Sequence, residues 1–123
     1  MTTAGELVTT FCAEWLTGTP ESIAEYFTED AVYHNIPMAP LVGKPAILEF
    51  LRGFIGAFGN IDFDVHRQAE IGDAVLNERT DKFTINGTAI ELPVMGSFEV
   101  RDGRIAAWRD YFDMTPLTKL GEG

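Results

Sequence analysis

The sequence predicts an α+β fold in which helices cover one side of a curved antiparallel sheet. Two patterns lead to this prediction. Apolar residues recur at helical spacing in three segments of the first half of the chain, and from residue 61 they alternate with polar residues. The pairs Asn86-Gly87 and Asp102-Gly103 are typical of tight hairpin turns, so the strands of the second half are expected to form a meander.

The first two helices are indicated by their starts. Thr3 and Glu6 have the spacing of a capping box at the beginning of an apolar stripe. Thr19 and Pro20 then provide a cap and a first-turn proline. We expect the second helix to begin there and to run through Phe27.

A short strand and a third helix are expected next. The strand is predicted over 31–35, and an irregular connection with two prolines follows it. The third helix is predicted over 45–58 from its apolar periodicity.

Four longer strands are expected over 61–71, 74–85, 88–101 and 104–112. In the first of them, strict alternation places one set of residues on a common face: Ile61, Phe63, Val65, Arg67, Ala69 and Ile71. The third contains Pro93 and Gly96, so we expect it to be bulged or to lie in part at an edge. The tail over 117–123 is expected to fray.

Composition narrows the classes of function. The formal net charge of −10 disfavours nucleic acid and anionic membranes as partners, because such a surface repels phosphate groups. Cys12 is the one cysteine, and His34 and His66 lack metal-ligand spacing. No nucleotide-binding motif occurs. We therefore expect neither a metal nor an organic cofactor.

We also expect one domain over 1–123, located in the cytoplasm. The length is typical of one domain, and no stretch approaches the ~20 apolar residues of a membrane helix. The N-terminal residues lack the basic start of a signal peptide.

Two charged residues fall on an apolar face of the strand expected over 74–85. Side chains alternate along a strand, so Arg79 and Asp81 point the same way as Val75 and Phe83. Charges on such a face are costly unless they are paired. The two residues are either a structural ion pair or part of a site, and this segment alone leaves both possibilities open.

Polar residues of two other strands show the same conflict. Asp110 shares a face with Trp108 and Phe112, and Tyr33 and Asn35 share a face of the short strand. Each has an ordinary explanation, as an edge-strand charge, a core tyrosine and a turn asparagine. Their combination with Arg79 and Asp81 favours a functional site.

Together, Tyr33-x-Asn35, Arg79-x-Asp81 and Asp110 resemble the catalytic residues of the limonene-1,2-epoxide hydrolase family. The resemblance implies an NTF2-like cone, in which three N-terminal helices wrap a curved mixed sheet. Ketosteroid isomerases and SnoaL-type cyclases share that fold, so the fold alone does not define a function.

The resemblance implies a role for each of the five residues. Asp81 is expected to protonate the epoxide oxygen, and Asp110 to deprotonate the attacking water. Tyr33 and Asn35 would help to hold that water, and Arg79 would bridge the two carboxylates. The epoxide would open to a vicinal diol in one step, without a covalent enzyme intermediate.

The resemblance also implies an apolar pocket for a small cyclic or terpene-like epoxide. Its lining is expected to consist of Trp15, Phe54, Phe58, Phe83, Leu92, Val94 and Phe112. A homodimer is expected as well, because the outer face of the sheet is left uncovered at Val100, Ile105 and Tyr111.

The residue types support this chemistry independently of the resemblance. Hydrolysis of an epoxide needs an acid and a base in the same site. With both aspartates ionised, an Asp–Arg–Asp triad carries a charge of −1, whereas it is neutral when it keeps one proton. Burial therefore favours keeping one proton, and the titrations of the two aspartates are expected to be coupled.

Three other functions stay open at this point. A ketosteroid-isomerase-like enzyme would use one aspartate as base and Tyr33 with protonated Asp81 as oxyanion hole, which leaves Arg79 without a role. A SnoaL-like cyclase or isomerase is open for the same reason. A non-catalytic module that binds a small ligand would not need the second aspartate.

Overall fold

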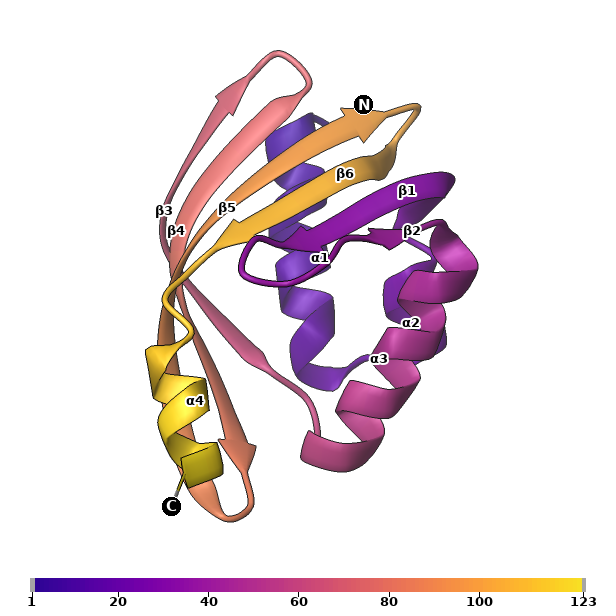
Figure 1. Cartoon of the computed structure of the whole chain (residues 1–123). Coiled ribbons are helices and arrows are strands. Elements are labelled where there is room, and N and C mark those ends of the chain that lie inside the picture. The colour runs from indigo at the N-terminus through magenta and orange to yellow at the C-terminus, as the bar shows by residue number, and fades with distance from the viewer. Residues whose placement is uncertain (1, 123) are drawn as a thin grey trace.

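The computed structural model describes residues 2–122, with side chains for 2–118, and is drawn in Figure 1. Its elements in chain order are α1 (Ala4–Thr17), α2 (Pro20–Ala24), β1 (Phe27–Asn35), β2 (Leu41–Val42), α3 (Lys44–Phe58), β3 (Asp62–Ile71), β4 (Ala74–Ile85), β5 (Thr88–Arg101), β6 (Arg104–Tyr111) and α4 (Thr115–Glu122).

The six strands form one mixed sheet in the order β2-β1-β6-β5-β4-β3. β1 pairs with β6 in parallel, and the other neighbouring strands are antiparallel. Figure 1 shows a strongly curved sheet with α1, α2 and α3 on its concave side, and the predicted α+β fold is confirmed. Among the described residues, no helix is long and apolar enough to cross a membrane.

The turn predictions are confirmed by the backbone. Asn86 and Gly87 have φ values of 50° and 80°, and Asp102 and Gly103 have 52° and 75°. Two consecutive residues with positive φ match the twist of the flanking strands, which is why Asn-Gly and Asp-Gly favour such turns. Asn86-Gly87 sets the register of β4 against β5, whereas Asp102-Gly103 sets only the first pairs of β5 with β6, because a register shift follows between Glu99 and Val100.

The second helix is shorter than predicted, and the strand after it is longer. α2 ends at Ala24, and β1 begins at Phe27, whose side chain is fully buried. Phe27 packs edge-on against Phe11 of α1, with ring centroids 5.4 Å apart. This long-range packing outweighs the local helical pattern that predicted a helix through Phe27.

β3 contains a bulge that strict alternation did not predict. Its register against β4 shifts between Val65 and Arg67. One extra residue turns every later side chain to the other face. Ile71 is therefore 68% exposed, although it was predicted to share a face with Phe63, and Gln68 points toward α1.

The predictions for β5 and for the C-terminal tail are corrected in part. β5 pairs with β4 without a register shift around Pro93 or Gly96, so no bulge lies there. Its pairing with β6 begins only at Met95, which leaves Pro93 in a stretch with one neighbouring strand, as predicted. The tail forms α4 instead of fraying, and Leu117 packs against a buried apolar cluster on β5.

Aromatic residues fill the space between the sheet and the helices. Trp108 of β6 lies at the centre, and rings from α1, β1, β3 and β5 surround it: Phe11, Trp15, Phe27, Tyr33, Phe63 and Phe98. Ile105 is fully buried, so it is not part of an uncovered outer face. The polar residues predicted on apolar faces lie at the edge of this core.

Candidate active site

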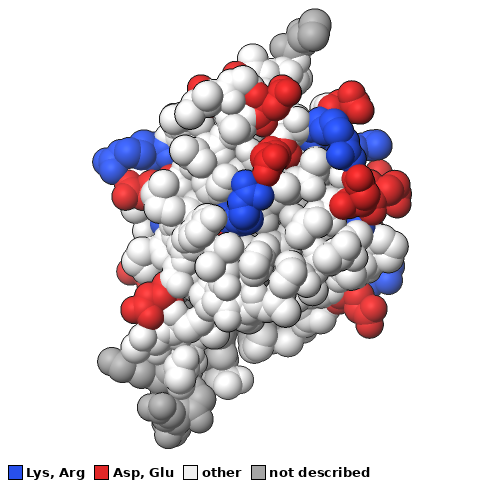
Figure 2. Space-filling model, turned by 45° about the horizontal axis from the view of Figure 1, so that its top comes forward, with Lys and Arg blue, Asp and Glu red and all other residues white. Residues whose placement is uncertain are grey.

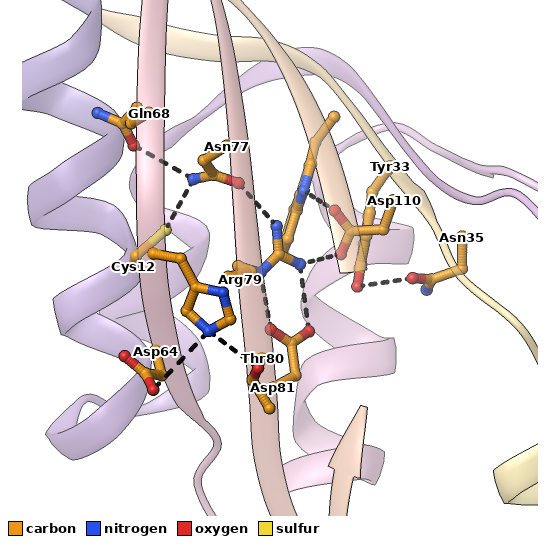
Figure 3. Close-up of polar contacts among 12 residues, drawn as sticks. Cys12, Tyr33, Asn35, Asp64, Gln68, Asn77, Arg79, Thr80, Asp81 and Asp110 are labelled. Atoms are coloured by element: carbon orange, nitrogen blue, oxygen red, sulfur yellow. Dashed lines mark hydrogen bonds and ion pairs between the residues drawn. The ribbon is translucent and has the colours of Figure 1, made fainter. Parts of the chain in front are cut away.

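Arg79 is the centre of a buried charged cluster on the concave side of the sheet (Figure 3). Its Nε and Nη2 donate to the two oxygens of Asp81 at 2.7 and 3.2 Å. Nη2 also donates to Oδ2 of Asp110. The guanidinium carbon lies 4.6 Å from the centre of the Phe63 ring. One planar cation therefore bridges two carboxylates from different strands, as the fork of an arginine permits.

Asp110 is held from a second side by the indole of Trp108. Trp108 Nε1 donates to Asp110 Oδ1 at 2.6 Å. Because the two residues are two apart on β6, the alternation of the strand places them on one face. Both oxygens of Asp110 thus accept an N–H donor, and its side chain is only 4% exposed.

Tyr33 and Asn35 come to the same place from the parallel neighbour of β6. The β1–β6 register sets Tyr33 opposite Trp108 and Asn35 opposite Asp110. The Tyr33 ring stacks on Trp108 at 4.1 Å between centroids, and its hydroxyl donates to Asn35 Oδ1 at 3.3 Å. The structure therefore brings together all five residues that the sequence singled out.

A cavity of about 220 Å³ opens beside the cluster. Asp81, Asp110, Tyr33 and Asn35 form its polar end, and Arg79 lies behind them. The rest of its lining is apolar and comes from Trp15, Met38, Phe50, Phe54, Ile61, Phe63, Phe83, Leu92, Phe112, Met114 and Leu117. An apolar pocket with convergent polar groups at one end is typical of a small-molecule site.

The predicted lining agrees with this cavity for five residues, namely Trp15, Phe54, Phe83, Leu92 and Phe112. The structure does not place Phe58 or Val94 on it. Phe58 is the last residue of α3 and borders a different hollow together with Lys82 and Glu91. Val94 is buried in a separate cluster with Ile90 and Leu92.

Sequence reasoning missed several residues around the cluster. Met114 and Leu117 line the cavity because the tail folds back as α4, which its short apolar content did not reveal. Phe63 was assigned to a core face without a role. Asn77 shares the face of Arg79 by strand alternation, and that parity was the signal that could have identified it.

Gly96 provides the space in which the guanidinium lies. It pairs with Asn77 of β4 on one side and with Asp110 of β6 on the other. A Cβ at this position would lie 2.4 Å from Arg79 Nη1 and 3.0 Å from Asp110 Oδ1. Arg79 can therefore cross β5 to reach Asp110 because residue 96 has no side chain.

A family model described as the limonene-1,2-epoxide hydrolase catalytic domain matches residues 9–120. The chain belongs to the limonene-1,2-epoxide hydrolase family. The match includes all five polar residues of the cluster and nearly the whole of the sheet and helices.

A protein sequence and a solved structure from Mycobacterium tuberculosis are similar to this chain. Epoxide hydrolase EphG of strain ATCC 25618 / H37Rv is 40% identical over 91 residues, which are 74% of this chain and 60% of that protein. The matched part is thus less than two thirds of that relative. A solved structure of an LEH-like epoxide hydrolase is 34% identical, with a TM-score of 0.84, over 94% of this chain and 86% of that chain.

The fold is shared more widely than the family. A SnoaL-like polyketide cyclase structure from Shewanella denitrificans has a TM-score of 0.85 over 98% of both chains, at 14% identity. At that identity the likeness concerns the fold alone. The predicted NTF2-like and SnoaL-like architecture is confirmed.

In this member of the limonene-1,2-epoxide hydrolase family, burial determines which groups of the charged cluster keep a proton. Desolvation raises the pKa of Asp81 to about 6, although Arg79 acts to lower it. Desolvation also raises the pKa of Asp110, against Arg79 and the Trp108 N–H. Burial acts to lower the pKa of Arg79, but the two carboxylates outweigh it and keep the guanidinium charged. Desolvation raises the pKa of Tyr33, which stays a neutral phenol.

The raised pKa of Asp81 predicts that the free energy of unfolding declines between about pH 4 and about pH 7. The folded state binds this proton more tightly than the unfolded state, so its stabilisation is complete below the ordinary pKa and is lost as pH rises through the raised one. A shift of about two pKa units corresponds to roughly 3 kcal/mol. Urea unfolding of the wild type and of Asp81→Asn across this range measures it. An equally steep decline in both proteins would contradict the assignment.

Proposed function

We propose that this protein hydrolyses a small apolar epoxide to a vicinal diol in one step, without a covalent enzyme intermediate and without a metal or organic cofactor. The observation that carries the proposal is a pair of buried carboxylates, bridged by one arginine, at the polar end of an apolar cavity. Family membership and the names of the similar M. tuberculosis sequence and structure support it.

The proposed chemistry divides acid and base between the two aspartates. Asp81 gives its proton to the epoxide oxygen as the carbon–oxygen bond breaks. Asp110 takes a proton from the water whose oxygen forms the new bond to carbon, and Tyr33 and Asn35 hold that water. The Trp108 N–H, which favours the ionised form of Asp110, supports its assignment as the base. Burial raises the pKa of both aspartates, which supports one retained proton in the triad, and the assignment of that proton to Asp81 follows the family resemblance.

The charge of the triad stays constant through this reaction. Before turnover Asp81 is protonated and Asp110 is ionised, and after ring opening the two have exchanged states. In both states one proton and the Arg79 cation balance the two carboxyl groups. A buried site avoids in this way the cost of an uncompensated charge. A proton must return from Asp110 to Asp81 before the next cycle.

The cavity supports a compact, hydrocarbon-rich substrate. Its volume of about 220 Å³ is below the roughly 300–1,000 Å³ of typical ligand pockets. Its apolar wall combines aromatic rings from α1, α3, β3, β4 and the residue after β6 with aliphatic side chains, and it has no charged residue away from the triad. We propose a cyclic or terpene-like epoxide, whose one polar atom would meet Asp81.

A panel of epoxides tests the proposed function. Limonene oxide, cyclohexene oxide and styrene oxide are incubated with the protein, and diols are measured by chromatography. Diol formation from at least one cyclic epoxide is expected. Inactivity on every epoxide, together with isomerisation of a 3-keto-steroid, would instead favour a ketosteroid-isomerase-like enzyme.

Replacement of Arg79 by lysine is expected to lower kcat by about 100-fold or more, since a small misplacement of reacting groups has that effect. An ammonium group is a point charge and cannot donate to both carboxylates in the planar geometry of a guanidinium. Steady-state kinetics with the best epoxide of the panel measures the effect. Arg109→Lys is the matched control, because Arg109 forms its ion pair with Glu99 away from the cavity. Near-wild-type kcat in Arg79→Lys would refute the bridging role.

We also propose a homodimer that forms through the outer face of the sheet. Figure 2 shows an area without charged side chains below a basic side chain at the middle of the view, with acidic side chains above that one and further charged groups on both sides. Met95 and Tyr111 pair across β5 and β6 and are 46% and 49% exposed. Light scattering after gel filtration measures the mass. Replacing both residues by glutamate is expected to produce monomers, and a monomeric wild type would contradict the proposal.

A further inference from the structure

We infer that Asn77 is a positioning residue that holds the guanidinium of Arg79 in the orientation that serves both aspartates. The catalytic meaning of this inference rests on the proposed function. Asn77 lies two residues before Arg79 on β4, and alternation places both side chains on the concave face. Its side chain is buried, with the residue 1% exposed.

The contacts of Arg79 divide its guanidinium into two edges. Nε and Nη2 donate to Asp81, and Nη2 also donates to Asp110. Nη1, on the other edge, donates to Asn77 Oδ1 at 3.1 Å. Among the described residues, Asn77 is the one hydrogen-bond acceptor of Nη1. Asn77 therefore holds the Nη1 edge of the guanidinium, which neither carboxylate contacts.

A chain of hydrogen bonds from α1 fixes which end of the Asn77 amide faces Arg79, and Figure 3 shows its part from Gln68 through Asn77 to Arg79. Gln68 Nε2 donates to the Gly5 carbonyl at 3.0 Å and to Thr9 Oγ1 at 3.1 Å. The Gln68 oxygen must then face Asn77, whose Nδ2 donates to it at 3.2 Å. An amide with its nitrogen engaged in this way presents its oxygen to Arg79.

The bulge in β3 is what makes this chain possible. Without the register shift between Val65 and Arg67, Gln68 would point to the outer face of the sheet. With it, Gln68 pairs with Asn77 across β3 and β4 and lies between β4 and α1. Bulges often redirect one side chain beside an active site. Here the redirected residue connects the first helix to the triad.

The space around Asn77 leaves the guanidinium little freedom. Gly96 lies opposite, and a Cβ there would be 3.0 Å from Asn77 Oδ1. Asn77 is also neutral, so it accepts the Nη1 hydrogen bond without adding a third carboxylate to the triad. With this acceptor removed, Arg79 is free to turn about its bonds to Asp81, and the distance between acid and base is no longer fixed.

Asn77→Ala tests the inference. We expect kcat to fall by about 100-fold with KM changed by no more than about twofold, because misplaced reacting groups slow chemistry rather than binding. Asn60→Ala is the matched control. Like Asn77, Asn60 uses its side-chain amide to join distant segments: its Nδ2 donates to the backbone carbonyls of Trp15 and Gly18 at 2.9 Å, but it does not touch the triad. Its kcat is expected to stay near that of the wild type.

A second readout does not depend on turnover. Arg79 is the one buried arginine among the described residues, so its side-chain N–H protons are expected to exchange slowly and to give resolved NMR signals, which Arg79→Lys removes. In Asn77→Ala the Nη1 proton signals are expected to disappear while the Nε signal remains. Asn77→Ser, whose hydroxyl is too short to reach Nη1, replaces the alanine variant if alanine prevents folding.

Unchanged Nη1 signals in a folded variant would overturn the inference, and so would an equal loss of kcat in Asn60→Ala. If the wild type hydrolyses no epoxide, the proposed function fails. The NMR signals then still decide whether Asn77 holds Arg79.

Discussion

Asp81→Asn and Asp110→Asn are each expected to lower kcat by 10²- to 10⁴-fold, roughly the contribution of one positioned acid or base. An amide has nearly the shape of a carboxylic acid but can neither deliver nor accept the proton at neutral pH. In Asp81→Asn the epoxide oxygen would leave without a proton donor. In Asp110→Asn the attacking water would keep its proton. Steady-state kinetics on the best epoxide measures both.

The fold is expected to survive both substitutions, which separates chemistry from stability. Asparagine keeps one oxygen that can accept from Arg79, and in each variant the remaining aspartate can ionise and balance the Arg79 cation. Circular dichroism and the melting temperature are the controls. Asp64→Asn is the matched variant, since Asp64 pairs with Lys82 in an exposed position. A folded Asp81→Asn or Asp110→Asn protein with substantial activity would refute the assignment.

Gly96→Ala is expected to disrupt the triad by displacing Arg79. The new methyl group would lie 2.4 Å from Nη1, far inside contact distance, while two carboxylates and Asn77 hold the guanidinium in place. Moving Arg79 away breaks at least one buried ion pair, which costs about 3–5 kcal/mol. We expect the free energy of unfolding to fall by about this amount and kcat to fall about 100-fold or more.

A second glycine provides the control for this substitution. Gly56 lies in α3, and a Cβ there would meet no atom within 4 Å. Gly56→Ala is therefore expected to be neutral or stabilising by about 1 kcal/mol, the difference in helix propensity. Urea unfolding and kinetics of both variants make the comparison. Equal stabilities for the two alanine variants would show that residue 96 needs no empty space beside Arg79.

The fold could be predicted from local patterns wherever these determine structure on their own. Asn86-Gly87 and Asp102-Gly103 require positive φ, and this fixed two of the hairpins. The extent of α2 could not be predicted in the same way. Phe27 fits a helical stripe locally, but its packing against Phe11 and its pairing with Ile105 of β6 place it in β1.

The charged residues of the site could be predicted from the alternation of side chains along a strand, and the prediction was incomplete where that alternation breaks. Alternation along β4 and β6 placed Arg79, Asp81 and Asp110 on the concave face, as the structure has them. The bulge in β3 breaks the same rule, so Gln68 and its link to Asn77 could not be predicted. A bulge depends on the partner strand, and the sequence of β3 alone carries no sign of it.

Only part of the cavity lining could be predicted from the sequence, because the lining depends on contacts between segments that are distant along the chain. Phe54 and Phe83 meet across α3 and β4 with centroids 5.8 Å apart and line the cavity. Phe58, one turn later, lies beyond its edge. β6 ends at Tyr111, opposite Met95, so residues 88–94 of β5 have no partner strand on that side. The chain after β6 folds back there, which brings Met114 and Leu117 to the cavity.

One measurement tests the proposed one-step mechanism most directly: single turnover in water labelled with oxygen-18, with the protein in excess over the epoxide. If Asp110 activates water that attacks the epoxide, the diol of the first turnover carries one labelled oxygen. If a carboxylate attacks the epoxide instead, the first diol takes an unlabelled oxygen from the protein. We predict a labelled diol, and an unlabelled first diol with the label retained on an aspartate in later cycles would contradict the mechanism.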